Sequence, residues 1–341
     1  MTEGNVHFVT GPSRSGTTLC CRVLGNHSQV LGLKELHYFG ELFDVDAGRA
    51  VISDKDLVNS AAMLLARQAR DSWVDGPTDT ELEEARKLVA ALPAEKHNGA
   101  DLYAAVVSYL AAARGRVWAC EQTPRNIFYA EKLLDFYPQA RVIYMVRDPR
   151  AVLASQKNRW QIRRLGARNV PYSEVVRIWF NYHPITMSSL WTRATQAAIE
   201  LEQHPRVRLL RFEDLVDEPE QTVKDLCAWL DLEFEPGMLA VPQWGSSNVT
   251  HDSEAPGVSA TMTDQWKTVL SDGEIRISEQ RTAAFLSRFD YPVVTNGKLN
   301  ASAWLQLLVR YPLHLVGAVL TNPRRVWIQL RAIMRRPARA S

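Results

Sequence analysis

The stretch that decides the fold is Val6-His7-Phe8-Val9-Thr10-Gly11-Pro12-Ser13-Arg14-Ser15-Gly16-Thr17-Thr18-Leu19. Its apolar start predicts a buried strand, its glycine-bounded middle predicts a tight loop, and its two threonines predict the start of a helix. A loop of this kind directs backbone N–H groups and a helix N-terminus at one point, where they bind an anion. The stretch therefore predicts a phosphate cradle.

The cradle departs from the nucleotide-triphosphate pattern G-x-x-x-x-G-K-[ST] at one position. Gly11 and Gly16 bracket four residues as that pattern requires, but Thr17 stands where the pattern has lysine. The cation of this loop is instead Arg14, two residues before the second glycine. We therefore expect the anion to be bound by a guanidinium group.

The composition is that of an ordinary globular protein. The chain has 341 residues, of which 46% are hydrophobic and 23% are charged. It is long enough for one large α/β domain, or for one domain that carries a helical insertion. The four cysteines form no C-x-x-C pair and have no histidine at metal spacing, so we expect buried thiols and neither a zinc site nor a disulfide framework.

Charge is distributed unevenly along the chain. The last acidic residue is Asp290, and every charged residue after it is basic. These basic residues are Lys298, Arg310, Arg324, Arg325, Arg331, Arg335, Arg336 and Arg339. We therefore predict one domain over residues 1–297 and a separate basic tail over residues 298–341.

Strand and helix patterns alternate along the chain. Apolar runs predict one strand that begins at Val6 and four more at residues 30–33, 117–121, 141–147 and 207–212. Helices are expected at residues 17–26, 126–137, 149–160, 173–204, 218–230 and 274–289, with a helical insertion at about 42–116. This alternation predicts an α/β fold, with a central parallel sheet flanked by helices.

The tail contains apolar stretches at residues 304–309 and 313–320. Arg310, Pro312 and His314 interrupt them, so the tail does not form an uncharged span of the length that crosses a bilayer. We expect a basic amphipathic helical segment that lies on an anionic membrane face, with Trp304 and Trp327 as anchors. The alternative is a helix that packs on the core and leaves its arginines solvated.

No charged segment followed by an apolar one precedes Val6. The sequence therefore predicts a cytoplasmic protein, with the inner face of the membrane as the place where the tail makes peripheral contact.

Three features together go beyond a glycine-rich loop. They are the cradle with Arg14, the ionisable cluster Lys34-Glu35-Leu36-His37, and Arg147 at a strand end followed by Ser155. In these features the chain resembles the sulfotransferase family. The matching segments are Gly11-Pro-Ser-Arg-Ser-Gly-Thr-Thr18, Glu121-Gln-Thr-Pro124, Val146-Arg-Asp-Pro-Arg-Ala-Val-Leu-Ala-Ser155, Leu210-Arg-Phe-Glu-Asp-Leu-Val216 and Gln265-Trp-Lys267. The resemblance runs from about residue 5 to residue 290 and does not reach the tail.

The resemblance implies transfer of a sulfuryl group from 3′-phosphoadenosine 5′-phosphosulfate (PAPS) to an acceptor hydroxyl or amine. The residues that would bind the 5′-phosphosulfate are those of the cradle: Gly11, Arg14, Ser15, Gly16, Thr17 and Thr18. Arg14 would also stabilise the charge that grows on the bridging oxygen, without a metal ion. Arg147 and Ser155 would bind the 3′-phosphate, which distinguishes this donor from ATP.

The resemblance also implies a base that takes the proton of the acceptor. Family members commonly place it in a Lys-Glu-x-His context, which residues 34–37 match, so we predict Glu35 as the base. His37 is the alternative base or an orienting group, because imidazole titrates in the useful range.

One position departs from the family. Related enzymes often have lysine where Gln122 stands, and glutamine brings no charge. Either Arg14 alone supplies enough positive charge for the phosphosulfate, or Lys267 supplies a second cation, or the activity is weak. Phe212 is expected to stack near adenine or to be a core aromatic beside its strand.

Two other functions remain open on the sequence. A P-loop kinase or NTPase would use Asp148 as a magnesium ligand, but Thr17 in place of lysine and Arg147 directly before Asp148 disfavour it. The second is a non-catalytic, membrane-associated binding module. Nucleic acid is not expected as a partner, since no basic stripe lies within the globular part. For the acceptor, a carbohydrate or glycolipid is favoured, and the helical insertion and the loop at about 242–264 are expected to shape its pocket. The sequence indicates no oligomeric state.

Overall fold

The computed structural model describes residues 5–70, 74–161, 170–241, 264–295, 301–323, 327 and 330. Most of the predicted acceptor loop lies outside these residues. So do all the basic residues of the tail except Arg310, while Trp304 is described in its backbone alone.

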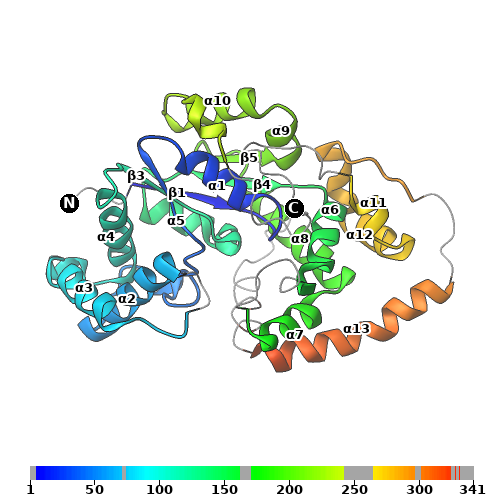
Figure 1. Ribbon diagram of the computed structural model, residues 1–341, viewed down its shortest axis with the longest axis horizontal. Coiled ribbons are helices and arrows are strands. Elements are labelled where there is room, and N and C mark those ends of the chain that lie inside the picture. The colour runs from blue at the N-terminus through cyan, green and yellow to red at the C-terminus, as the bar shows by residue number, and fades with distance from the viewer. Residues whose placement is uncertain are drawn as a thin grey trace.

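A five-stranded parallel sheet forms the centre of the molecule (Figure 1). The strands are β1 (Val6–Thr10), β2 (Val30–Gly32), β3 (Trp118–Glu121), β4 (Val142–Val146) and β5 (Val207–Arg211). Their order across the sheet is β2-β3-β1-β4-β5, and every pair is parallel. This confirms the predicted fold class and the five predicted strands. Because all strands run in one direction, the five segments that follow them emerge at one edge of the sheet.

The helices surround this sheet. They are α1 (Thr17–Gly25), α2 (Asp54–Arg70), α3 (Asp79–Ala90), α4 (Gly99–Ala112), α5 (Ala130–Phe136), α6 (Pro149–Lys157), α7 (Tyr172–Asn181), α8 (Pro184–Ile199), α9 (Phe212–Asp217), α10 (Pro219–Leu230), α11 (Trp266–Val269), α12 (Asp272–Leu286) and α13 (Ala301–Thr321). Short 3-10 helices occur at Val45–Ala47 (η1), Ala94–Lys96 (η2), Pro124–Tyr129 (η3), Arg159–Gln161 (η4), Pro236–Leu239 (η5) and Ser287–Phe289 (η6).

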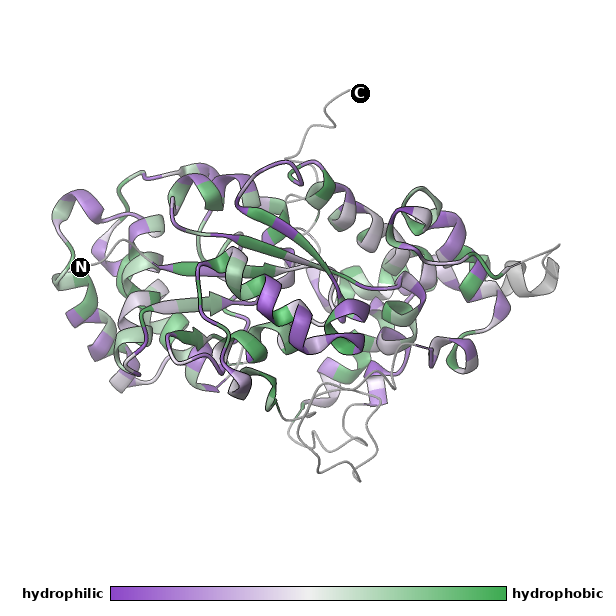
Figure 2. Ribbon diagram, turned by 90° about the horizontal axis from the view of Figure 1, so that it is seen from above, coloured by the Kyte–Doolittle hydropathy of each residue, from purple (hydrophilic) through white to green (hydrophobic). Residues whose placement is uncertain are grey.

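Alternating side chains divide the core between the two faces of the sheet. On β1, Phe8 belongs to one buried cluster and Val9 to the other, and Tyr144 and Ile143 divide in the same way on β4. The Val9 face is covered by α1 and α10, and the Phe8 face by α4, α5 and α8. Figure 1 shows α10 above the sheet and α8 below it. Covered on both faces, the strands are mostly apolar, and they form the predominantly green centre of Figure 2.

Two predicted helices are divided in the structure. The helix expected over residues 173–204 is broken between α7 and α8, because Pro184 begins α8 and the residue before it, His183, is extended. The helix expected over 126–137 begins as the 3-10 helix η3 and becomes α-helical only at Ala130. Between β2 and β3 lie α2, α3 and α4, in the segment predicted to be a helical insertion.

All four cysteines are buried and free, as predicted. The C-terminal helix α13 contacts α7 and α12. None of the helices described here combines the length and apolar character required to span a bilayer.

Candidate active site

The predicted cradle forms between β1 and α1. Gly11 has φ 146°, and a Cβ there would lie 2.4 Å from the carbonyl oxygen of Met145. Gly16 has φ 92°, and a Cβ there would lie 2.4 Å from the ring of Phe212. Both positions therefore require glycine, for conformation and for space. Gly16 is also the N-cap of α1 and has no side chain to cap it, so the first N–H groups of the helix face the loop.

Three predicted site residues converge beside this loop. The Nε of Arg14 donates a hydrogen bond to the Oγ of Ser155 at 3.0 Å. The Nη1 of Arg147 donates to the backbone carbonyl of Arg14 at 3.1 Å. Arg14 has φ 79°, a left-handed conformation uncommon for a residue with a side chain. The segments after β1 and β4, far apart in the sequence, thus meet at the cradle.

Phe212 packs between the cradle and Arg147. Its ring is buried, fills the space beside Gly16, and lies 4.2 Å from the guanidinium of Arg147. The Nε1 of Trp191 donates to the carbonyl of Arg147 at 3.0 Å, which fixes the backbone where the strand ends. The orientation of Arg147 thus depends on aromatic residues from α8 and α9.

The site concentrates positive charge. Burial, together with the charges of Arg159 and Arg147, lowers the pKa of Arg14 to about 10, while Glu35 acts in the opposite direction. An anion bound here would relieve the repulsion among these guanidinium groups. Arg159 was not among the predicted residues. It follows Ser155 by four positions, about one helical turn, and this spacing is the signal that could have revealed it.

The predicted base and its alternative form a pair. The Nε2 of His37 lies 3.1 Å from the Oε2 of Glu35. Burial acts to raise the pKa of Glu35, but the hydrogen bond from His37 and the charges of Arg159 and Arg14 outweigh it and hold the pKa below its usual range. Glu35 is therefore a carboxylate at neutral pH, coupled electrostatically to the cation of the cradle.

Glu121 holds the N–H groups of the turn that carries this pair. Its buried Oε1 accepts hydrogen bonds from the backbone N–H of Leu36 at 3.1 Å and of Thr123 at 3.0 Å. Thr123 donates its hydroxyl to Glu121 and accepts the N–H of His37 at 3.0 Å. Burial raises the pKa of Glu121 to about 7, although these hydrogen bonds oppose the shift. The sequence marked residues 121–124 but not this role.

An arginine holds the carbonyl groups of the same turn. Arg67 donates to the carbonyls of Leu36 at 2.6 Å and His37 at 2.9 Å. Arg67 and Arg125 both pair with Glu41, at 3.0 and 2.7 Å. Burial opposes ionisation of Glu41, but the charges of Arg125, His37 and Arg67 prevail and lower its pKa to about 2. Sequence reasoning missed this cluster, because Glu41, Arg67 and Arg125 lie outside the recognised motifs and are far apart in the chain.

Some buried polar atoms near the cradle lack a hydrogen-bond partner among the residues described. They include the hydroxyl of Ser15 and the Oε1 of Gln122. The carbonyl of Pro124 accepts the N–H of Gly11 at 3.2 Å, so the segment containing Gln122 is fastened to the loop. Unsatisfied buried groups are costly in a protein interior, and a polar ligand would satisfy them. At the start of α1, Thr17 is buried and Thr18 is exposed.

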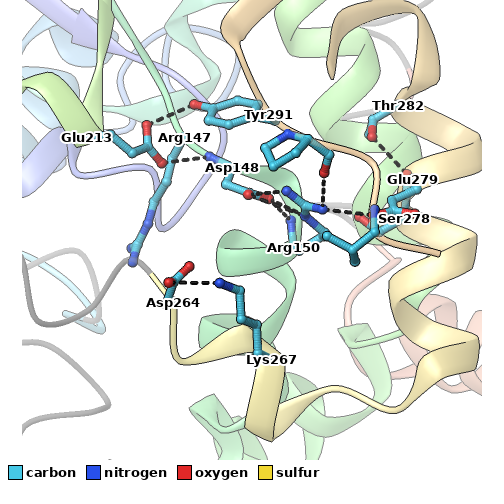
Figure 3. Close-up of polar contacts among 12 residues, drawn as sticks. Arg147, Asp148, Arg150, Glu213, Asp264, Lys267, Ser278, Glu279, Thr282 and Tyr291 are labelled. Carbon is cyan, nitrogen blue, oxygen red and sulfur yellow. Dashed lines mark hydrogen bonds and ion pairs between the residues drawn. The ribbon is translucent and has the colours of Figure 1, made fainter. Parts of the chain in front are cut away.

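Lys267 lies on α11, which contacts α6. Its ammonium group pairs with Asp264 at 2.8 Å, and its side chain is 54% exposed. In Figure 3 the side chain of Arg147 points toward the side on which this pair lies. Its neighbour Trp266 is buried beneath the guanidinium of Arg150, at 4.1 Å. The contribution of Lys267 to ligand binding stays a prediction.

Asp148, the candidate magnesium ligand of a kinase, makes its contacts within the protein instead. Its carboxylate caps α6 by accepting the N–H of Arg150 at 2.8 Å, and it pairs with that residue's guanidinium at 2.7 Å (Figure 3). The fully buried Arg150 also pairs with Glu279 of α12 at 2.8 Å. Asp148 therefore caps α6 and holds Arg150, whose guanidinium joins α6 to α12. Within the described parts of the chain, no three His, Cys, Asp or Glu side chains are grouped so that they could hold a metal ion.

Comparison with known proteins identifies the family of the chain. The sequence model of the sulfotransferase family matches residues 7–236. Sulfotransferase 2A1 of Rattus norvegicus is 28% identical over 128 residues, a match that covers 37% of this chain and 44% of that protein. The chain thus spans less than half the length of this relative.

A solved sulfotransferase domain shares the fold. The sulfotransferase domain of the curacin biosynthetic pathway is 20% identical, with a TM-score of 0.50 over 86% of this chain and 99% of that domain. The sulfotransferase domain of the Synechococcus PCC 7002 olefin synthase is 21% identical, with a TM-score of 0.45 over 81% of this chain and 93% of that domain.

Proposed function

Because this chain belongs to the sulfotransferase family, we propose that it transfers a sulfuryl group from PAPS to an acceptor hydroxyl. The observation that supports this most directly is the convergence of Arg14, Arg147 and Ser155 on the backbone cradle. A site with several guanidinium groups and a helix N-terminus suits a ligand that is anionic at more than one position.

The donor would be held at both ends. Backbone N–H groups at the start of α1, from Gly16 to Thr18, would bind the 5′-phosphosulfate, together with the hydroxyl of Ser15, which has no partner among the described residues. Arg147 and Ser155 would bind the 3′-phosphate, the group that ATP lacks. The donor supplies an activated sulfuryl group, and its departure leaves 3′-phosphoadenosine 5′-phosphate (PAP). Arg14 would stabilise the charge that develops on the oxygen between phosphorus and sulfur.

Glu35 would act as the general base. Its lowered pKa keeps it ionised at neutral pH, so it can accept the proton of the acceptor hydroxyl as the oxygen–sulfur bond forms and the bond from sulfur to the bridging oxygen breaks. His37, at 3.1 Å, would orient the carboxylate and share the proton that it receives. If His37 were the base instead, Glu35 would hold its imidazole in position.

Three further residues have proposed roles that depend on the bound donor. Gln122, whose Oε1 is buried without a partner among the described residues, would contact the phosphosulfate by hydrogen bonding in place of a lysine. Lys267 would supply additional positive charge after leaving Asp264. Phe212 would border the adenine while it supports Arg147.

We favour a carbohydrate or glycolipid acceptor. A chain divided into a sulfotransferase domain at 1–297 and a basic tail at 298–341 would suit a lipid-linked saccharide at a membrane. The tail has no acidic residue, and it would make peripheral contact with anionic lipid at the cytoplasmic face.

Thermal stability in the presence of two ligands tests the donor. PAP should raise the melting temperature of the purified protein more than ATP with magnesium does, and transfer should survive EDTA. The reverse ranking would favour a kinase, and no shift with either ligand would favour a binding module. A mass-spectrometric screen of saccharide, glycolipid and phenol libraries, looking for one added sulfate, would identify the acceptor.

A further inference from the structure

One side of the C-terminal helix α13 is fixed against α7 and the start of α8. The carbonyl of Leu307 lies 3.1 Å from the Nε2 of His183, and the ring of His314 lies 4.5 Å from that of Trp179. Gly317 faces Phe180 so closely that a Cβ there would lie 2.0 Å from its ring. These contacts define the inner side of the helix, and therefore also its outer side.

The outer side of α13 is apolar and exposed. A surface helix normally presents polar residues to water on its outer side. Here the exposed large residues are Leu308, Val309, Leu313, Leu315, Val316, Val319 and Leu320. The exposed fraction reaches 75% at Leu320. Between residues 307 and 321 the single residue with a formal charge is Arg310.

The neighbouring helix α7 extends this apolar area. Tyr172, Val176 and Trp179 are exposed and are spaced four and three residues apart, so they share one side of the helix. Trp179 touches His314 of α13 and thereby connects the two helices. Figure 1 shows α7 and α13 side by side at the edge of the molecule, away from the sheet. We call these ten exposed apolar residues the α7–α13 surface.

We propose that the α7–α13 surface is a docking surface for an anionic lipid membrane. Contiguous exposed apolar surface marks an interaction site, because its exposure to water is unfavourable. Charge selects the partner, since in the sequence Lys298 precedes α13, Arg310 lies within it and six arginines follow it, with no acidic residue after Asp290. A second copy of the chain would bring the same positive charge against this area, whereas anionic headgroups would neutralise it.

The geometry favours a helix that lies on the membrane. None of the helices within the described ranges could cross a bilayer, so the apolar side chains would enter the boundary between headgroups and acyl chains. Tyr172, Trp179 and Trp327, which is 60% exposed, have the amphipathic rings that prefer this boundary. The inference deepens the membrane contact proposed for the tail, by adding α7 and by defining the side that docks.

Vesicle sedimentation tests the inference with the full chain. The protein should sediment with vesicles of phosphatidylcholine and phosphatidylglycerol, and at least about tenfold less with phosphatidylcholine alone. The double variant Leu313→Gln, Leu320→Gln should lower binding to the anionic vesicles by at least about tenfold, because two exposed leucines no longer enter the apolar layer. Val117→Gln is the matched control, since Val117 is 58% exposed but belongs to neither helix, and it should bind as the wild type does.

Three results would overturn the proposal. They are no sedimentation of the wild type with anionic vesicles, equal sedimentation of the double variant, and a dimer in analytical ultracentrifugation that the double variant dissociates. A PAP-induced rise in melting temperature, measured on each variant, reports separately on folding and on the donor site. Failure of the proposed sulfuryl transfer would therefore leave the vesicle result interpretable, and loss of vesicle binding would not count against transfer.

Discussion

The cradle and the turn that carries Glu35 and His37 lie at the same edge of the sheet but are built by different means. The cradle depends on the backbone, with glycines at φ 146° and 92° and the uncapped start of α1. The turn depends on buried side chains from elsewhere in the chain. Glu121 with Thr123 holds its N–H groups, and Arg67 holds its carbonyls.

The two regions should tolerate different substitutions. A backbone cradle is sensitive to any added Cβ and insensitive to most side-chain exchanges. A turn held by buried charges is sensitive to the loss of any one member of the set, because the remaining members would be left unpaired in the interior. Two kinds of substitution should therefore separate the regions. One kind removes a side chain that acts on the reactants, and the other changes a residue that only holds the cradle or the turn in place.

Arg14→Ala should have the largest effect. Alanine keeps the backbone carbonyl that accepts the hydrogen bond of Arg147, so the cradle should persist while its cation is lost. We expect the rate of sulfuryl transfer from PAPS to fall by about 10³-fold, as it does when a hydrogen-bond donor that stabilises the transition state is removed. The measurement is kcat/KM for the identified acceptor, with Arg86→Ala, an exposed arginine of α3, as the control. Activity within twofold of the wild type would remove Arg14 from the chemistry.

Glu35→Gln should have the next largest effect. Transfer should fall by about 10²-fold, while the rise in melting temperature with PAP is retained, because a base acts on the acceptor and not on the donor. Glu83→Gln, an exposed glutamate of α3, is the control. Wild-type rates in Glu35→Gln would transfer the role of base to His37.

The pH profile of the wild type distinguishes the two bases in another way. Since the pKa of Glu35 is lowered, activity that needs its ionised form should be present above the usual glutamate range and decline only as pH falls below about 4.3. A decline that already begins near neutral pH would count against Glu35 as the base.

Gly16→Ala should damage the cradle through its backbone and its packing. Gly16 and Gly115 both have positive φ, but a Cβ at Gly16 would meet the ring of Phe212, while a Cβ at Gly115 would have nothing within 4 Å. We expect Gly115→Ala to lower the free energy of unfolding by about 1 kcal/mol and Gly16→Ala by about 3 kcal/mol. Urea denaturation of both variants measures the difference, which isolates the contact with Phe212. Equal losses would mean that the ring moves aside.

Glu121→Gln should have the smallest effect on transfer, a decrease of about tenfold with PAP binding unchanged, because it disturbs only the support of the turn. The pH dependence of its stability is more specific. The pKa of Glu121 is raised to about 7 in the folded protein, so its protonated form favours folding. That contribution is complete below the unfolded value of about 4.3 and is lost as pH rises through about 7.

The wild type should therefore lose free energy of unfolding relative to Glu121→Gln across this window, by up to about 1.4 kcal/mol per pH unit. Chemical denaturation of both proteins at several pH values measures the difference. A constant difference from pH 5 to 8 would contradict the raised pKa. A loss of PAP binding in the variant would show that the turn and the cradle are not independent.

Much of the sheet could be predicted because each strand has its own apolar run. The break at Pro184 was missed, since the helical pattern continues on both sides of the proline. Arg14, Arg147 and Ser155 could be predicted as site residues because they lie in recognisable motifs. It could not show that Arg14 bonds Ser155 directly, or that Arg159 adds its charge, because those contacts depend on how α6 packs over the loop.

Local chemistry alone determined the cradle, the strands and the cation at position 14. Steric limits on φ and the alternation of apolar side chains act between close neighbours, so the order of residues suffices to express them. Packing brings distant residues together: Glu121 accepts the N–H of Leu36, Arg67 donates to the carbonyl of Leu36, and His314 of α13 contacts Trp179. These pairings join segments far apart in the chain, and only packing around a common sheet brings them within contact distance.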